Sequence, residues 1–281
     1  ADKKIYALRD VTATVGCIPL IASSIMSKKL AAGSDAILLD VTMGDGAFMK
    51  DLDSALELAR QMVAIGTAHG RRVAALITDM DKPLGRNIGN SLEVAESMAV
   101  LQGRGPADLT EVCLQLASNM LVLAGKGDMP TCRRLAESVI ADGSAFEKCC
   151  QMFAAQGGDI SVLKDASKFR KAKYSCELTA PSDGYIYKND VEKIGNASVL
   201  LGAGRIKKED SIDFAAGITM HKKLGDHVSA GESICTLYAD DEALFAPAEE
   251  MYRGGLVIRE EKPALPPLIY ARVTSDGVER F

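Results

Sequence analysis

The chain has 281 residues, of which 47% are hydrophobic and 25% charged, with a formal net charge of −5 at pH 7. This composition is that of a folded globular protein and excludes a long disordered chain. No apolar run approaches the roughly 20 residues that cross a bilayer, and no run of one charge sign offers a footprint for nucleic acid or an anionic membrane. We therefore expect no nucleic-acid or membrane partner. The N-terminus has no apolar signal-peptide core, so we expect a cytoplasmic location.

The 7 cysteines and 3 histidines are scattered along the chain without the spacing of a metal site. No C-x-x-C pair and no H-E-x-x-H motif occurs. We interpret the cysteines as reduced, small apolar side chains. A histidine-based catalytic triad is not indicated.

The first predicted helix covers residues 18–30, where apolar residues recur at helical spacing. Ser24 and Lys28 are four residues apart, so one helix face presents a hydroxyl and an ammonium together, flanked by Ile21 and Ile25. Arg9 precedes the helix and could fold back over it. Such a mixture suits a planar, partly apolar ligand such as a nucleobase. A solvated lysine and a surface or capping serine explain the same spacing.

The next stretch predicts a βαβ unit. A buried strand at 36–41 is followed by a glycine loop, a helix at about 51–69 closed by Gly70, and a second buried strand at 73–77. This order requires parallel pairing of the two strands. Open α/β sheets bind ligands at the carboxyl ends of their strands, where Gly44-Asp45-Gly46 lies and a helix start could receive an anion. The loop is not G-x-G-x-x-G, so a dinucleotide is not implied.

After the second strand the chain passes through a Pro83-Leu84-Gly85 turn into a helix. The turn carbonyls, with the carboxylate of Glu96 further along the helix, could hold a hard cation. A turn followed by a helix cap explains the same residues.

From 90 to about 164 the pattern is almost entirely helical, with a capping box at 108–111 and further helices at about 130–141 and 144–156. After 173 short β-rich runs alternate with turn residues. We predict an α/β fold with a mixed, partly parallel sheet and flanking helices. Its predicted domains are a short helical remnant at 1–30, a central α/β domain at 31–165 and a β-rich α+β C-terminal domain at 166–281.

Taken together, the motifs resemble one family. The chain carries Y-x-x-R-D-V-T-A-T-V at 6–15, I-P-L-I-x-x-S-I-x-x-K-K at 18–29, D-V-x-x-G-x-G-A-F-M at 40–49, and D-x-x-x-P-L-G-R-x-x-G-N-x-L-E-V at 79–94. A-P-x-x-G-Y-I and G-D-x-V-x-x-G-E recur near the C-terminal end. In this order they closely resemble the thymidine and pyrimidine-nucleoside phosphorylases over essentially the whole chain.

The resemblance implies an enzyme that splits pyrimidine nucleosides such as uridine, thymidine and deoxyuridine with inorganic phosphate, giving the free base and a (deoxy)ribose 1-phosphate. It implies that the base is held by hydrogen-bonding groups, two of them catalytic, with a tyrosine beside the ring and apolar side chains around it. The catalytic residues are Arg9 and Lys28; Ser24 and Tyr6 complete the polar contacts; the walls are Val15, Ile21, Ile25, Phe48 and Met49.

The same resemblance implies a potassium ion, bound through the backbone carbonyls of Leu84 and Asn87 and the carboxylate of Glu96. Phosphate is the implied co-substrate, and a homodimer is implied for the complete protein. Neither the sugar nor the base preference is decided by these motifs.

Two departures from the family pattern stand out. The family carries Asp-Ser where this chain has Gly16-Cys17, which removes a capping hydroxyl before the first helix. The chain also begins where the base-binding segment of the family begins. The N-terminal helical region, with its K-x-S and glycine-rich phosphate signature, is absent, and we expect the chain alone to be inactive.

Two alternatives remain open. The segment 217–239 is similar to the G-D-x-V-x-x-G-E turn of biotinyl and lipoyl domains, which would make the chain a carrier or scaffold module. It has no M-K-M-type tip for the modified lysine, and a shared fold does not carry a function. A related phosphoribosyltransferase is the second alternative.

Overall fold

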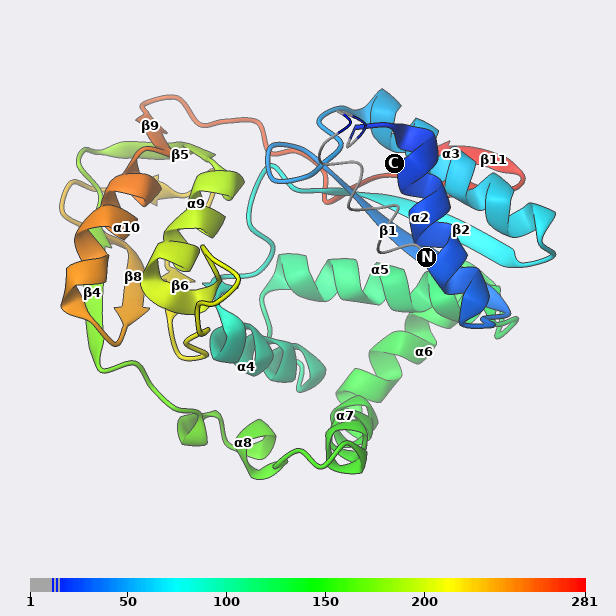
Figure 1. Ribbon diagram of the computed structural model, residues 1–281, viewed down its shortest axis with the longest axis horizontal. Coiled ribbons are helices and arrows are strands. Elements are labelled where there is room, and N and C mark those ends of the chain that lie inside the picture. The colour runs from blue at the N-terminus through cyan, green and yellow to red at the C-terminus, as the bar shows by residue number, and fades with distance from the viewer. Residues whose placement is uncertain (1–11, 13, 15) are drawn as a thin grey trace. The chain divides into compact units, whose positions relative to one another are not determined.

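The computed structural model describes residues 12, 14 and 16–281 (Figure 1). Tyr6, Arg9 and Val15 lie outside the described residues. Contacts group the chain into two units that do not follow chain order. Unit 1 comprises Ala1–Asp79, Val112–Ala136 and Pro267–Phe281, and unit 2 comprises Met80–Glu111 and Glu137–Pro266.

The centre of unit 1 is a four-stranded sheet of order β1-β2-β10-β11. Strands β1 (Ala36–Met43) and β2 (Arg72–Asp79) are parallel and in register along their whole length. They are the two strands of the predicted βαβ unit. β10 (Ile269–Thr274) pairs antiparallel with β2, and β11 (Gly277–Arg280) pairs antiparallel with β10. The partly parallel sheet predicted from the sequence is therefore confirmed.

Helices α2 (Ile18–Ala31) and α3 (Leu52–Ala68) lie on the same side of this sheet (Figure 1). Every second residue of β1 is buried in the core beneath them, as period-two alternation requires. Gly66 on α3 allows close packing, because a Cβ there would collide with Val73 on β2 and approach Met26 on α2. The glycine therefore sets how closely the three elements approach one another.

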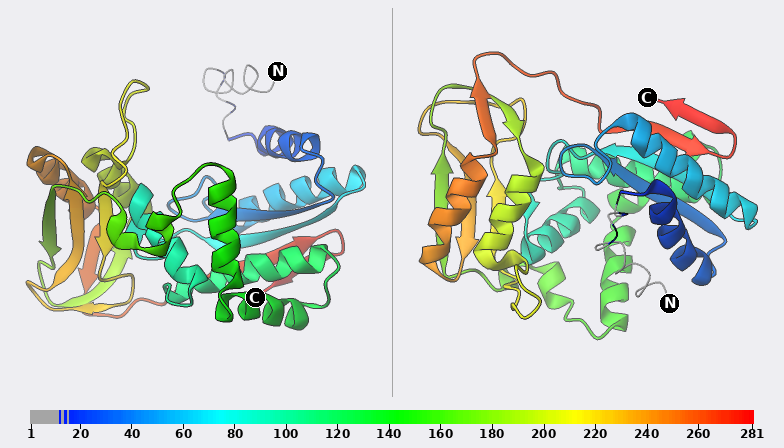
Figure 2. Two further views of the ribbon diagram at one scale, coloured as in Figure 1. Left: turned by 90° about the horizontal axis from the view of Figure 1, so that it is seen from below. Right: turned by 45° about the horizontal axis from the view of Figure 1, so that its top comes forward.

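The opposite side of the sheet in unit 1 is more polar. Asp40 and Thr42 on β1 point to that side and are exposed. Residues from Val112 onward of α5 (Ala107–Leu123) lie on this side (Figure 2). The following helix, α6 (Met129–Ala141), buries Cys132 and Ala136.

Unit 2 contains a small helical cluster. Helices α4 (Asn90–Leu101), α7 (Ser144–Ala155) and α8 (Ser161–Lys164) share a compact core. That core is made by a few buried side chains, namely Met98, Phe146, Cys150 and Leu163. A single 3-10 turn, η1 (Ala166–Lys168), follows and leads into the β-rich part.

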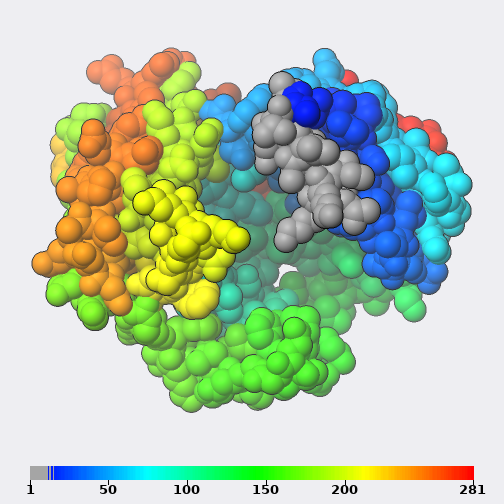
Figure 3. Space-filling view, in the orientation of Figure 1, coloured from blue at the N-terminus to red at the C-terminus, as the bar shows by residue number. Residues whose placement is uncertain are grey.

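The β-rich part of unit 2 consists of two sheets with a shared core and two covering helices. One sheet has the order β3-β6-β8-β4 and the other β7-β5-β9. Their strands are β3 (Asn87–Ile88), β4 (Tyr174–Thr179), β5 (Gly184–Asn189), β6 (Gly217–Met220), β7 (His227–Val228), β8 (Ser233–Ala239) and β9 (Leu256–Arg259). The helical segments are α9 (Val191–Ser198), η2 (Val199–Ala203), η3 (Glu242–Leu244) and α10 (Phe245–Arg253). The loop after η2, yellow in Figure 3, lies at the surface of unit 2.

Two details differ from the sequence-based expectations. The last two strands do not join the β-rich part: β10 pairs with β2, because a strand pattern does not specify its partner. The capping box expected at 108–111 is wrong, since α5 already begins at Ala107 and Asp108 lies within its first turn. Helices α9 and α10 lie inside the β-rich part, which confirms its predicted α+β character.

Among the described residues, no helix is both long and apolar enough to cross a bilayer. Within the same residues, no three His, Cys, Asp or Glu side chains cluster as a metal site would require. A metal site built largely from backbone carbonyls does not need such a cluster of side chains. The two units do not test the predicted domain boundaries at 30 and 165, which stay predictions.

Candidate functional site

Helix α2 carries the hydroxyl–ammonium pair that the spacing predicted. Lys28 Nζ donates a hydrogen bond to Ser24 Oγ at 3.1 Å. Ser24 is only 7% exposed, whereas Lys28 is exposed. The buried hydroxyl therefore fixes the position of an ammonium that solvent or a ligand can reach. This is the arrangement in which a cation can meet a carbonyl oxygen at a defined place.

The start of α2 reflects the departure at Gly16-Cys17. Cys17 is the N-cap residue, and its side chain makes no capping hydrogen bond. Its backbone carbonyl accepts from Leu20 N and Ile21 N, both at 3.0 Å. Pro19 lies in the first turn, where a missing N–H costs nothing. The helix therefore begins without the side-chain cap that a serine would provide.

The predicted apolar walls do not share one environment. Ile21 and Met49 are buried in the core of unit 1, and Ile25 packs against that core. Phe48 is 56% exposed, so of these four side chains it is the one with most surface available to a ligand. Burial of Ile21 and Met49 gives them a packing role that does not depend on any ligand.

The glycine loop between β1 and α3 forms a tight, self-bonded turn. Gly44 has φ of 127°, a conformation that favours glycine, and its N–H donates to Met49 O at 3.0 Å. Lys50 Nζ donates to Asp45 O at 2.7 Å. At the start of α3, Asp51 accepts a hydrogen bond from Ser54 N at 2.8 Å. Because a carboxylate already caps this helix, its start is a poor place for an anion.

Sequence reasoning missed a polar pair at the carboxyl ends of β1 and β2. Thr78 Oγ1 donates to Asp40 Oδ1 at 2.6 Å. Desolvation raises the pKa of Asp40, and the Thr78 hydrogen bond partly offsets this effect. Desolvation and the nearby Asp40 carboxylate also raise the pKa of Cys113 on α5. An aspartate inside an apolar strand was the available signal, because such a side chain needs a partner.

In unit 2, two of the three predicted cation residues, Asn87 and Glu96, are in contact through a hydrogen bond. Glu96 on α4 is 7% exposed. Its Oε1 accepts from Arg86 N and from Asn87 Nδ2, both at 3.0 Å. Its Oε2 lies against Gly85, where a Cβ would collide with it. The turn therefore wraps around a carboxylate that accepts hydrogen bonds from two neutral amides. Leu84, the remaining predicted ligand, is partly exposed in the same turn.

The strand register shows where the Asn87 carbonyl points. Met220 N on β6 donates to Arg86 O at 2.7 Å, which makes these two residues a hydrogen-bonded pair. The next pair, Asn87 with Thr219, is therefore a non-hydrogen-bonded pair of the antiparallel ladder. In a non-hydrogen-bonded pair the backbone carbonyl of Asn87 points away from β6. Because β3 is an edge strand, this carbonyl lies on the open side of the sheet. That oxygen is available to a ligand, together with the carboxylate of Glu96.

Comparison with known proteins supports the order of motifs described above. Residues 1–146 match the family described as "Glycosyl transferase family, a/b domain". Residues 185–259 match the one described as "Pyrimidine nucleoside phosphorylase C-terminal domain".

Individual relatives carry the name pyrimidine-nucleoside phosphorylase. The protein from Geobacillus stearothermophilus is 50% identical over 275 residues, covering 98% of this chain and 63% of that relative. The protein from Bacillus subtilis (strain 168) is 49% identical over 275 residues, with the same two shares. The one from Staphylococcus aureus (strain USA300) is 52% identical over 241 residues, covering 85% of this chain and 56% of the relative. The chain thus spans less than two thirds of the length of these relatives.

Proposed function

The chain belongs to the pyrimidine-nucleoside phosphorylase family of glycosyl transferases, and on this premise we propose that it acts in the phosphorolysis of pyrimidine nucleosides. Uridine, thymidine and deoxyuridine are the proposed substrates, and the products are the free base and a pentose 1-phosphate. In this proposal the chain supplies base recognition and stabilises the leaving group. The observation that carries it is the Lys28–Ser24 pair on α2.

The chemistry gives these residues a definite task. When the glycosidic bond breaks, negative charge develops on the oxygens of the pyrimidine. A cation and donors fixed at those oxygens therefore favour the transition state over the ground state. The Ser24 hydroxyl holds the Lys28 ammonium, and Arg9 is the second proposed cation, outside the described residues. No nucleophilic side chain is required, because phosphate itself attacks the sugar.

Phosphate must also be held in line with the breaking bond, which can lower the barrier by roughly 7–11 kcal/mol. The glycine loop is poorly suited to this, because the carboxylate of Asp51 caps the helix behind it. Lys173-Tyr174-Ser175 has the K-x-S spacing, but it runs into strand β4 and not into a glycine loop. We therefore propose that the 281 residues alone do not turn over nucleoside, and need a separate phosphate-binding region.

A potassium ion fits the residues of the turn around Glu96. The buried carboxylate and the outward-facing Asn87 carbonyl are hard oxygen donors, which suit such an ion. Leu84 O would be the third ligand. When bound, the ion supplies positive charge that balances the Glu96 carboxylate. The residues of the chain themselves hold the turn through the Arg86 N–H and the Asn87 amide.

The carrier alternative is disfavoured by the lysines of the biotinyl-like segment. Lys222 pairs with Glu232 and donates to His227 O, and Lys223 pairs with Asp108. A lysine that accepts a cofactor must be exposed and unpaired at a hairpin tip. Family membership supports a homodimer and a cytoplasmic location as further proposals, which sedimentation and cell fractionation would test.

Binding of the free base tests the proposal on the chain as it exists. Uracil and thymine are titrated into the isotopically labelled protein while its amide NMR signals are followed. We expect saturable shifts centred on α2, weakened at least about tenfold in affinity by Lys28→Ala. Lys29→Ala is the matched control, since its side chain leaves α2 on a different face. No saturable binding, or equal binding by both variants, would refute the assignment.

A further inference from the structure

Gly85, at the centre of the Leu84–Asn87 turn, is held through its backbone carbonyl by an ion pair. Lys223 Nζ donates to Gly85 O at 2.6 Å, and the same ammonium pairs with the Asp108 carboxylate. The Gly85 N–H also helps to lower the pKa of the Asp108 carboxyl group. The Gly85 carbonyl and the Asp108 carboxylate are therefore joined through the ammonium of Lys223.

The conformation of Gly85 is one that these contacts have to stabilise. Its φ of 73° lies in the left-handed region, and glycine there has the largest conformational freedom to lose. Glu96 lies against the Cα of Gly85 and accepts the next backbone N–H, that of Arg86. The peptide that presents the predicted cation ligands is thus fixed by one carboxylate and one ion pair.

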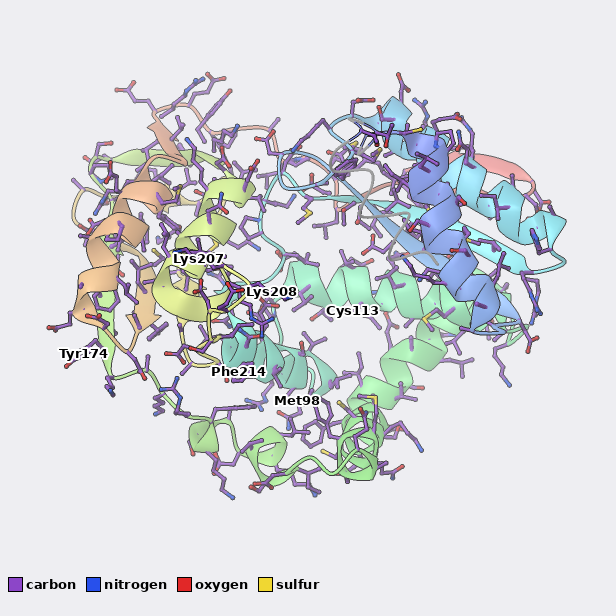
Figure 4. All side chains as sticks on the ribbon, viewed as in Figure 1. Met98, Cys113, Tyr174, Lys207, Lys208 and Phe214 are labelled. Atoms are coloured by element: carbon purple, nitrogen blue, oxygen red, sulfur yellow. The ribbon has the colours of Figure 1, made fainter. Side chains whose placement is uncertain are left out.

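Lys223 is more buried than the lysines of a surface loop in unit 2. Lys207 and Lys208 lie exposed on the loop after η2 (Figure 4). The side chain of Lys223 is only 13% exposed. An ammonium withdrawn from water to this extent must be compensated by charged or carbonyl oxygens. Gly85 O and the Asp108 carboxylate provide this compensation.

The pKa of Asp108 reflects its pairing with Lys223. Desolvation would raise the pKa of its carboxyl group, but the Lys223 hydrogen bond and charge lower it more, with help from the N–H groups of Leu109 and Gly85. Asp108 lies in the first turn of α5, where a negative charge is also favourable. The ion pair therefore ties the start of α5, the turn and the β6–β7 connection together within unit 2.

We propose that Asp108 and Lys223 are positioning residues that lock the Leu84–Asn87 turn in its ligand-ready form before any cation binds. We call the Asp108–Lys223 pair and its hydrogen bond to Gly85 O the lock. These contacts support the lock, whereas its use for a cation rests on the proposed function. A monovalent ion at Glu96 then meets a preformed turn and does not have to order it. Removal of the lock makes the order of the turn depend on the ion.

Amide hydrogen exchange of residues 84–88 tests the lock directly. Exchange is measured in potassium chloride and in tetramethylammonium chloride at equal ionic strength, for the wild type, Lys223→Met and Asp108→Asn. Lys222→Met is the matched control: this neighbouring lysine is also paired, but its ammonium contacts Glu232 and the carbonyl of His227. Strands β4 and β8 of unit 2 report whether a variant has unfolded that unit.

Without potassium, we expect the turn of the wild type and of Lys222→Met to be protected. Lys223→Met and Asp108→Asn should exchange there about 10- to 100-fold faster, as the loss of a charged hydrogen bond implies. Potassium should restore protection in these two variants. If Lys223→Met unfolds, Asp108→Asn decides, because its amide preserves the shape of the side chain.

Two results would overturn the lock: wild-type protection in both variants without potassium, or a wild-type turn protected only with potassium. If the two variants exchange fast and potassium does not restore their protection, the result would support the lock and contradict the proposed cation site. The two proposals can therefore fail separately.

Discussion

Replacement of Lys28 by alanine should separate a role in catalysis from a role in folding. Lys28 is exposed, and its Nζ donates a hydrogen bond to Ser24 Oγ at 3.1 Å. Loss of an exposed contact changes the free energy of unfolding by less than about 0.5 kcal/mol. Loss of one donor from the developing charge of the leaving group costs about 100-fold or more in kcat/KM, or about 2.7 kcal/mol. Catalysis should therefore suffer far more than stability.

The assay compares Lys28→Ala with Lys29→Ala in phosphorolysis of uridine and in thermal unfolding. Both lysines lie in the last turn of α2, so their effects on the helix dipole cancel in the comparison. The enzyme is the chain supplemented, where turnover requires it, with the part of the Geobacillus relative that it does not match. Lys28→Arg should recover only part of the rate, because a planar fork replaces a point charge. Equal kcat/KM values for the two alanine variants would show that Lys28 does not meet the base.

Further predictions concern the turn, the cation and a cysteine. Gly85→Ala should lower the free energy of unfolding by about 1–3 kcal/mol in a denaturant titration, because φ is positive and Glu96 leaves no room for a methyl group; an unchanged midpoint would contradict this geometry. Potassium should raise the melting temperature relative to tetramethylammonium, and Glu96→Gln should abolish the difference; a difference of the same size in Glu96→Gln would place the ion elsewhere. Since desolvation and the Asp40 carboxylate raise the pKa of Cys113, less thiolate is present at pH 8 than in a free cysteine. Iodoacetamide should therefore alkylate Cys113 (Figure 4) more slowly than it alkylates the thiol of free glutathione, and Asp40→Asn should accelerate the reaction of Cys113. The opposite order of rates would be inconsistent with the raised pKa.

The sequence predicted those elements whose local pattern has a single physical solution. The βαβ unit follows from two short buried runs around an amphipathic helix, and β1, α3 and β2 form as expected. Helix spacing likewise placed Ser24 and Lys28 on one face of α2. These features depend on residues within about four positions of one another, or on one crossover connection.

Other features depend on partners that lie far apart in the chain. Strand β10 completes the sheet of unit 1 nearly 200 residues after β2, and no local pattern specifies this pairing. The carboxylate of Asp108 was expected to cap a helix, but it pairs with Lys223 more than a hundred residues later. Because a side chain has several local options, its tertiary partner decides among them.

The role of the chain in pyrimidine phosphorolysis is tested most directly by the identity of the sugar product, followed by ³¹P NMR and chromatography. Uridine or thymidine and phosphate are incubated with the chain, alone and with the unmatched part of the Geobacillus relative. We predict a pentose 1-phosphate in amounts equal to the free pyrimidine, formed only in the mixture and lost with Lys28→Ala. Robust turnover by the chain alone, release of free pentose, or a requirement for pyrophosphate in place of phosphate would contradict the proposed function.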